Sequence, residues 1–170
     1  MARRAALFLS HWHRLFVGLQ ESSQKIYAAI EEEVRKQNMP RVKLSRVTYH
    51  EKGMLSAKRE YLRVLRQKRI FDICAAPFGN NFFISWWLGE KSGFIASLIM
   101  TIPFFGPLLV EVFKPETYYT LDTTLMFQDS VHTAVLNVMD KVTAAKGLRA
   151  MTELERKPIM GDLFKKCKIS

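Results

Sequence analysis

The feature that most constrains this chain is a run of twenty residues, 94–113, with no Lys, Arg, Asp, Asn, Gln or His and a single acid, Glu111. About twenty such residues are what an α-helix needs to cross a bilayer. The run interrupts a 170-residue chain that otherwise has the pattern of a basic α+β domain. It therefore predicts a membrane insert, and the alternative is an apolar hairpin buried in a protein core.

Pro103, Gly106 and Pro107 stand at the middle of this run, where a bend would be needed for both of its ends to lie on one side of the membrane. Each half would then span roughly 15 Å, about half of a bilayer. A re-entrant hairpin and a single tilted span both stay open, since membrane helices tolerate proline. The candidate membrane contacts are Trp87, Phe94, Ile99, Phe104, Phe105, Leu108, Leu109 and Tyr118.

The positive charge is concentrated in one window. The net charge is +10, and residues 35–69 hold twelve Lys and Arg against two acids, so the remainder of the chain sums to zero. Such a field attracts polyanions, although a solvated surface without a ligand is the simpler interpretation. Arginine beside aromatic residues suits phosphate groups because its planar fork binds two oxygens. The candidate anion-binding or partner-binding residues are Arg59, Arg63, Arg66, Lys68 and Arg69.

Two further features indicate where in the cell the protein lies. Residues 1–93 carry a charge of +9 and residues 94–170 a charge of +1, and basic loops stay on the cytoplasmic side of a membrane. Cys74 and Cys167 are too few for a disulfide framework, which fits a reducing compartment. We therefore expect a membrane protein whose β domain lies on the cytoplasmic face, with Cys74 as a small core residue.

Periodicity predicts the order of the elements. Residues 11–37 have an apolar stripe at helical spacing, and alternation predicts strands at 41–51, 58–67, 69–76, 82–88 and 117–127. A second helix is expected from 129 or 130 to a cap at Gly147. The fold class is thus α+β, an N-terminal helix and a small antiparallel sheet of about five strands closed by a C-terminal amphipathic helix. The expected divisions are an N-terminal helix at 1–40, a β domain with the insert at 41–147, and a basic amphipathic tail at 148–170.

This order of elements over 41–147 resembles that of bacterial pleckstrin-homology-like domains. The resemblance implies a small curved antiparallel sheet closed by the C-terminal helix. It rests on element order and carries no motif, so no binding residue is transferred. The N-terminal helix and the apolar run depart from the pattern.

The sequence has no recognisable catalytic or cofactor motif, neither a phosphate-binding loop nor a dinucleotide fingerprint, zinc-protease motif or nucleophile elbow. Cys74 has no histidine in a motif context, and His11 and His13 do not have zinc-ligand spacing. Asp72 stands alone in an apolar strand, where we expect an ion pair with a neighbouring arginine such as Arg63. We therefore predict no enzyme activity, no cofactor and no metal.

The leading hypothesis is a non-enzymatic, membrane-associated binding or assembly module that uses a basic β surface and the apolar insert. One alternative is a membrane-perturbing effector that oligomerises through the insert. Another is a soluble subunit of a larger assembly that buries the apolar hairpin against a second chain. The expected partners are anionic lipid and a protein or a second copy, whereas the lack of a nucleic-acid-binding signature argues against nucleic acid.

Overall fold

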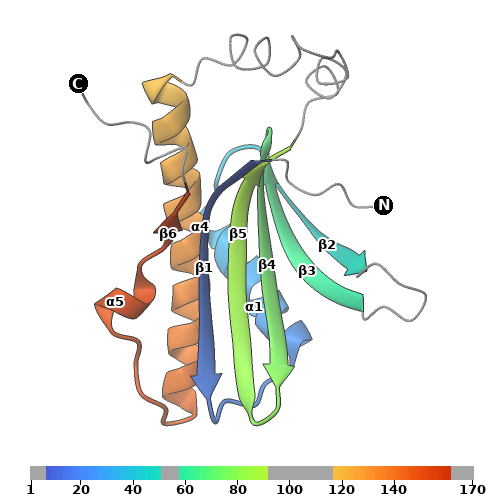
Figure 1. The fold of residues 1–170 in the computed structure, drawn as a ribbon, viewed down its shortest axis with the longest axis vertical. Helices are drawn as coiled ribbons and strands as arrows, with labels where there is room; N and C mark the ends of the chain where they lie inside the picture. Colours follow the sequence, from blue (N-terminus) through green and yellow to red (C-terminus); the bar gives the residue numbers. More distant parts are fainter. Residues whose placement is uncertain (1–6, 51–57, 92–116, 162–170) are drawn as a thin grey trace, which may run out of the picture.

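A computed structural model describes residues 7–50, 58–91 and 117–161 (Figure 1). In this part of the chain six strands form one sheet in the order β2-β3-β4-β5-β1-β6, and every pairing is antiparallel. The α+β class and the antiparallel sheet are therefore confirmed. The strands are β1 (Leu7–Val17), β2 (Val42–His50), β3 (Lys58–Arg66), β4 (Arg69–Phe78), β5 (Asn81–Glu90) and β6 (Ile159–Met160), and the helices are α1 (Ser23–Lys36), α4 (Tyr118–Ala145) and α5 (Glu153–Arg156).

The four strands predicted between 41 and 88 are all present. They form a meander in which each strand pairs with the next along the chain. The β4–β5 turn contains Gly79, whose φ of 58° lies in the left-handed region that two-residue hairpin turns need at their first central position. The turn predicted around Gly79 is thus confirmed.

The N-terminal helix is shorter than predicted, because residues 7–17 form strand β1 along the whole length of β5. Both faces of β1 carry apolar side chains: Trp12 and Phe16 are buried on one face, whereas Leu15 and Val17 are exposed on the other. Apolar residues on both faces hide the alternation of a strand, so Leu15 matched the helical stripe by spacing alone. Helix α1 begins only at Ser23 and buries Ile26, Tyr27, Ile30 and Val34.

Both long helices pack on the same face of the sheet, behind the strands in Figure 1. The inward-facing residues of β4 and β5 and the buried stripe of α4 form the core between the two layers. Phe71 of β4 meets Phe127 of α4 edge-on at 6.1 Å between ring centroids, and Trp86 of β5 packs at 4.6 Å from Phe71. The core is therefore a single layer of side chains between the sheet and the two long helices. The described helices leave the opposite face of the sheet uncovered.

Residues 117–127 form the first turns of α4, so the strand predicted there is wrong. The side-chain oxygen of Thr117 caps the helix by accepting a hydrogen bond from the Thr120 backbone N–H. Thr124, Phe127 and Val131 follow at helical spacing and are buried against the sheet. This packing outweighs the β propensity of the Thr and Tyr residues, which is a weak and context-dependent preference. The end of α4 is as predicted, with Gly147 just beyond it at a φ of 65°.

Residues 148–161 fold back along β1, although the sequence suggested only an amphipathic tail. The indole N–H of Trp12 donates to the Glu155 carbonyl at 2.8 Å. The Gly161 N–H donates to the Leu9 carbonyl at 2.6 Å, in a contact so close that a Cβ on Gly161 would lie 2.5 Å from that oxygen. β6 thus adds a short edge strand beside β1.

The apolar run 94–113 lies outside the described residues, as do Phe94, Ile99, Phe104, Phe105, Leu108, Leu109 and Cys167. In the ranges 7–50, 58–91 and 117–161, no helix is both long and apolar enough to cross a membrane. The prediction of a membrane insert is therefore not confirmed.

Candidate functional site

The register of the sheet gathers basic residues at one of its ends. Arg66 of β3 lies opposite Val42 of β2 on one side and Arg69 of β4 on the other, and Arg69 lies opposite Glu90 of β5. Lys91 follows directly, and its N–H donates to the Lys68 carbonyl at 2.8 Å. We call this region the cationic end; its basic residues are Arg41, Lys43, Arg66, Lys68, Arg69 and Lys91.

Glu90 is the acid in this row, and it is held by two of the basic residues. The Arg69 guanidinium donates to the Glu90 carboxylate at 2.7 Å, and the Lys68 ammonium lies 3.3 Å from the other carboxylate oxygen. The side chains of Arg69 and Glu90 are only 5% and 4% exposed, whereas that of Lys68 is 44% exposed. One carboxylate therefore neutralises one of two adjacent cations, and Lys68 keeps part of its side chain in solvent.

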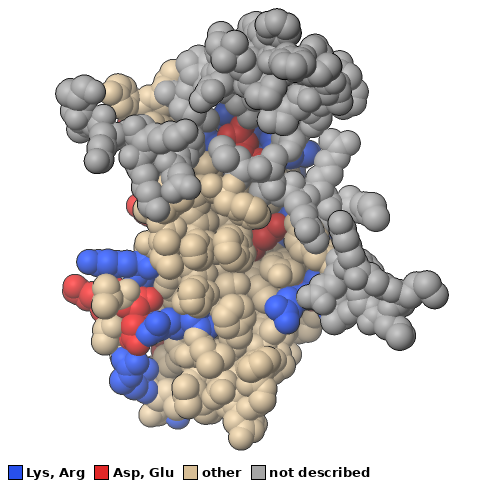
Figure 2. Space-filling view, in the orientation of Figure 1, with Lys and Arg blue, Asp and Glu red and all other residues tan. Residues whose placement is uncertain are grey.

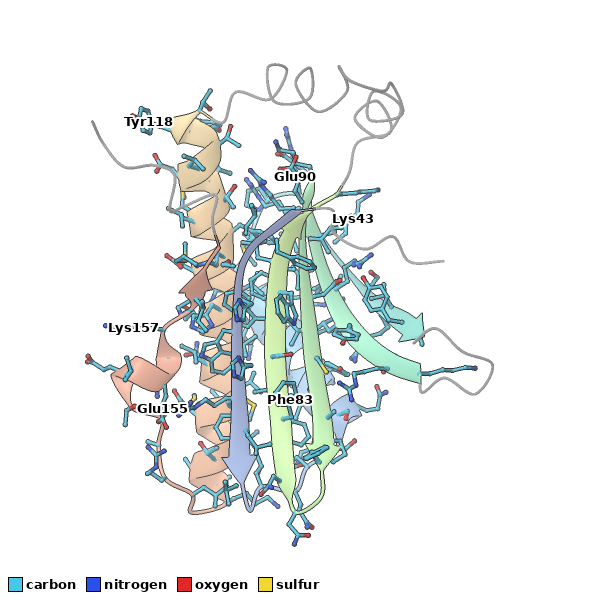
Figure 3. The ribbon with its side chains drawn as sticks, in the orientation of Figure 1. Lys43, Phe83, Glu90, Tyr118, Glu155 and Lys157 are labelled. Carbon is cyan, nitrogen blue, oxygen red and sulfur yellow. The ribbon has the colours of Figure 1, made fainter. Side chains whose placement is uncertain are left out.

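The same end of the domain is where the apolar run departs and returns. Lys91 directly follows β5, and Thr117 directly precedes α4. Figure 3 shows Glu90, Lys43 and Tyr118 at one end of the long axis. Tyr118 and Tyr119 are more than 80% exposed there, on the first turn of α4. The domain thus combines, at one end, the two flanks of the apolar run, a group of cations and two exposed tyrosines.

Arg63, one of the anion-binding candidates, forms an ion pair within the sheet. It lies opposite Asp72, and its Nε and Nη2 atoms each donate to a carboxylate oxygen of Asp72 at 2.7 Å. The Tyr49 hydroxyl donates to the same carboxylate at 2.8 Å, and burial together with this hydrogen bond raises the pKa of Tyr49 to about 12. The predicted ion pair of Asp72 with Arg63 is therefore confirmed.

Arg59 lies at the far end of β3, next to Tyr61 and Cys74. Burial raises the pKa of the Cys74 thiol, which is 1% exposed, so it is a core residue as predicted. His13 lies two strands away from Cys74 across Ser85, or about 10 Å. The register thus keeps this histidine out of hydrogen-bond reach of the thiol. In the described ranges, no three His, Cys, Asp or Glu residues are grouped as a metal site would require.

The face of the sheet that the helices leave uncovered carries exposed rings on β1 and β5. The Trp87 ring stacks on His11 with centroids 4.6 Å apart, and Phe8 packs edge-on against Trp87 at 5.5 Å. Partial burial and the nearby His13 lower the pKa of His11. Trp86 is buried and Trp87 is 41% exposed, so these neighbours lie on opposite faces of the sheet, one in the core and one at the surface.

A buried histidine on α4 was missed in the sequence. The Trp86 indole N–H donates to His132 Nδ1 at 3.0 Å, so Nε2 carries the proton and donates to the Arg156 carbonyl at 2.6 Å. Burial lowers the pKa of His132. The position of His132 between Val131 and Val135, both apolar, was the available signal. This network joins the sheet, α4 and the C-terminal segment.

Of the five predicted anion-binding residues, the structure brings Arg66, Lys68 and Arg69 together at the cationic end. It separates them from Arg63, which is bound to Asp72, and from Arg59 at the opposite end of β3. Two of the membrane-contact candidates are in the described ranges. Tyr118 lies at the cationic end, and Trp87 lies on the face of the sheet that the helices leave uncovered.

Comparison with models of known protein families finds no match to this chain, and comparison with curated proteins finds none either. The crystal structure of TTHA0849 from Thermus thermophilus is similar at 15% sequence identity and a TM-score of 0.29, covering 79% of this chain and 97% of that one.

Proposed function

We propose that this protein is a non-enzymatic, membrane-associated binding module that rests on an anionic bilayer by its cationic end. The observation that carries the proposal is that both flanks of the apolar run lie at the end of the domain where the cations gather. In this arrangement residues 94–113 contact the acyl chains, and the β domain lies on the cytoplasmic side.

The positions of the flanks support an insert that enters and leaves one leaflet. A single straight span would carry Lys91 and Thr117 to opposite sides of the membrane. Here β5 and α4 belong to one packed core, so the two residues start from the same end of one folded unit. Exposed tyrosines such as Tyr118 and Tyr119 are typical of the headgroup region, where an amphipathic ring is favoured.

Distance decides which cations act on such a surface. Lys58 and Arg66 are eight residues apart on the extended strand β3, or about 26 Å. Screening in physiological salt reduces the field of an exposed charge over about 8 Å, so Lys58 and Arg59 lie roughly three screening lengths from a membrane at the other end. Lys43 and Arg66, by contrast, lie at the end of the sheet that would face the membrane.

A matched pair of double variants tests the proposal. Lys43→Gln with Arg66→Gln removes two charges from the cationic end, and Lys58→Gln with Arg59→Gln removes two from the opposite end of the same hairpin. Each cation near an anionic surface contributes about 1 kcal/mol, so the first variant weakens binding to phosphatidylserine-containing vesicles roughly thirtyfold in a cosedimentation assay. The second variant binds like the unmodified chain.

Neutral vesicles serve as the control surface, on which the two variants behave alike. Binding to anionic vesicles also falls with added salt, because the attraction is screened. Equal losses in the two variants, or an equal loss on neutral vesicles, would refute orientation by the cationic end. A variant that binds vesicles normally but no longer retains a copurifying protein would favour an acidic protein partner instead.

A further inference from the structure

The face of the sheet opposite the helices concentrates the exposed apolar residues of the described chain. Six of the ten large exposed hydrophobic residues in the described ranges lie on it. β1, β5 and β4 supply most of them, and β6 adds one opposite His11. We call this the open face; its six exposed apolar residues are Phe8, Leu15, Val17, Phe78, Trp87 and Ile159.

Among the described residues, charged side chains are missing from the centre of the open face. The outward positions of β1, β5 and β6 hold no Lys, Arg, Asp or Glu. The neighbouring strand β4 holds Asp72, which is 8% exposed and bound to Arg63. Figure 2 looks onto this side and shows a broad uncharged area, bordered by blue side chains to its left and right and by red ones above it. Figure 3 places Phe83 within this area.

The absence of charge on these strands limits the kinds of partner that would fit the open face. A polyanion or an acidic protein needs cations at the contact, and the described centre of the open face has no Lys or Arg on β1, β5 or β6. A second copy of this chain has the opposite requirement. In a two-fold dimer a patch packs against itself, so any charged residue near the axis would meet its own like charge. For a chain of net charge +10, an uncharged face is the surface on which two copies can meet.

The size of the face agrees with such a contact. The exposed parts of Phe8, Phe78 and Trp87 alone amount to roughly 350 Å², because an aromatic side chain offers 150–250 Å². The three aliphatic residues and the half-buried rings of His11 and Phe83 add to this area. The open face thus approaches the roughly 800 Å² per partner of a specific interface, and monomers seldom leave such a patch uncovered.

We infer that two copies of this chain pair through the open face, sheet against sheet, with Trp87, His11 and Leu15 near the centre of the contact. Two sheets that pack face to face lie about 10 Å apart and interdigitate their side chains. A two-fold axis parallel to the strands keeps both cationic ends directed the same way. The pairing therefore does not depend on membrane binding, and it is compatible with two copies resting on one bilayer.

The test is the mass of the full chain in mild detergent without lipid, measured by sedimentation over a wide range of concentration. Leu15→Glu places a carboxylate on the open face, and Leu154→Glu makes the same change on α5, at a leucine that is 80% exposed and lies off the sheet. The unmodified chain and Leu154→Glu sediment as dimers. Leu15→Glu weakens pairing by at least about a hundredfold, because two carboxylates are buried against each other in each dimer.

Site-specific crosslinking locates the contact. His13→Cys, in a background with Cys74→Ala and Cys167→Ser, puts one thiol on the centre of the open face of each copy. A short bis-maleimide joins two such chains, and it does not join chains that carry the cysteine at Leu154 instead. Circular dichroism of each variant shows that the fold is retained.

Three results would overturn the inference. They are a monomeric unmodified chain at every concentration, a Leu15→Glu variant that dimerises normally, and a dimer that His13→Cys does not crosslink. If Leu15→Glu leaves the mass unchanged and lowers vesicle binding, the open face contacts lipid rather than a second copy. Loss of vesicle binding in the Lys43 and Arg66 variant is a separate readout, so pairing and membrane binding fail independently.

Discussion

The carboxylate of Asp72 accepts two hydrogen bonds from the guanidinium of Arg63, directly across the β3–β4 pair, at 2.7 Å each. Both side chains are about nine-tenths buried on the open face, and Tyr49 completes the cluster. This pair uses one of the arginines that the sequence offered as anion ligands. It also explains how an acid is accommodated among the apolar residues that flank it in β4.

Asp72→Asn is expected to destabilise the protein. The change leaves the largely buried Arg63 charge without its counter-ion, which costs about 2–3 kcal/mol and lowers Tm by roughly 5–10 °C in a thermal melt. Glu32→Gln is the control, because Glu32 forms a solvent-exposed pair with Lys36, and exposed pairs of this kind contribute little to stability. Equal melting temperatures for the two variants would contradict a structural role for the Arg63–Asp72 pair.

Glu90→Gln is expected to change stability and membrane binding in opposite directions. Removing the carboxylate leaves Arg69 buried with one partner fewer, so the free energy of unfolding falls. The cationic end gains one net positive charge, so binding to anionic vesicles tightens about fivefold. Both are measured on one preparation, by chemical denaturation and by cosedimentation below the unfolding transition. Weaker vesicle binding of the folded variant would argue against the cationic end as the contact.

Acidification is expected to destabilise the core through His132. Burial lowers its pKa below the value of 6.5 that applies in the unfolded chain, so between the two values the unfolded state binds more protons. Stability is thus lost as pH falls below about 6.5. The cause is local: a proton on Nδ1 would face the indole N–H of Trp86.

Denaturant unfolding at a series of pH values measures this dependence. The difference between the unmodified chain and His132→Gln isolates the contribution of His132. A His11→Gln variant is titrated alongside, because burial and His13 lower the pKa of His11 as well. Parallel curves for the unmodified chain and His132→Gln would show that His132 does not titrate with unfolding.

Lys91 and Thr117 are expected to lie on one side of the membrane. Single cysteines at these positions, in a background with Cys74→Ala and Cys167→Ser, are offered an impermeant maleimide in sealed vesicles. Both are labelled from the same side, because β5 and α4 are packed in one core. Labelling from opposite sides would establish a single span and would require a different placement of the domain.

Residues 94–113 are expected to hold the protein in the membrane during a carbonate wash. Ile99→Arg combined with Leu108→Arg places two charges in the apolar run, and each costs about 3 kcal/mol at the centre of a bilayer. The double variant therefore moves into the soluble fraction. Circular dichroism runs in parallel, since a soluble but unfolded variant would indicate a hairpin buried in the protein core. Unchanged retention in the pellet would reject insertion.

The strands between 41 and 88 were predictable because each pairs with its neighbour in the chain and their information is local. Alternation sets the two faces of each strand, and a turn such as that at Gly79 sets the register of the next. The contact of Arg63 with Asp72 follows from the same register. The local pattern predicts the wrong element for residues 7–17 and 117–127, because both depend on distant partners. Residues 7–17 pair with β5, more than sixty residues away. Residues 117–127 pack on the sheet core, more than thirty residues away.

The sequence by itself determined the excess of positive charge, the apolar run, the α+β class and the hairpins of the meander, since composition and short-range periodicity carry these features. Only the tertiary structure decided that β1 lies beside β5, that the long helices share one face of the sheet, and that Arg66, Lys68 and Arg69 meet at the end where the apolar run departs. The physical reason is that strand order and helix docking depend on which distant segments bury each other's apolar faces. That choice is settled by the whole core rather than by any local pattern.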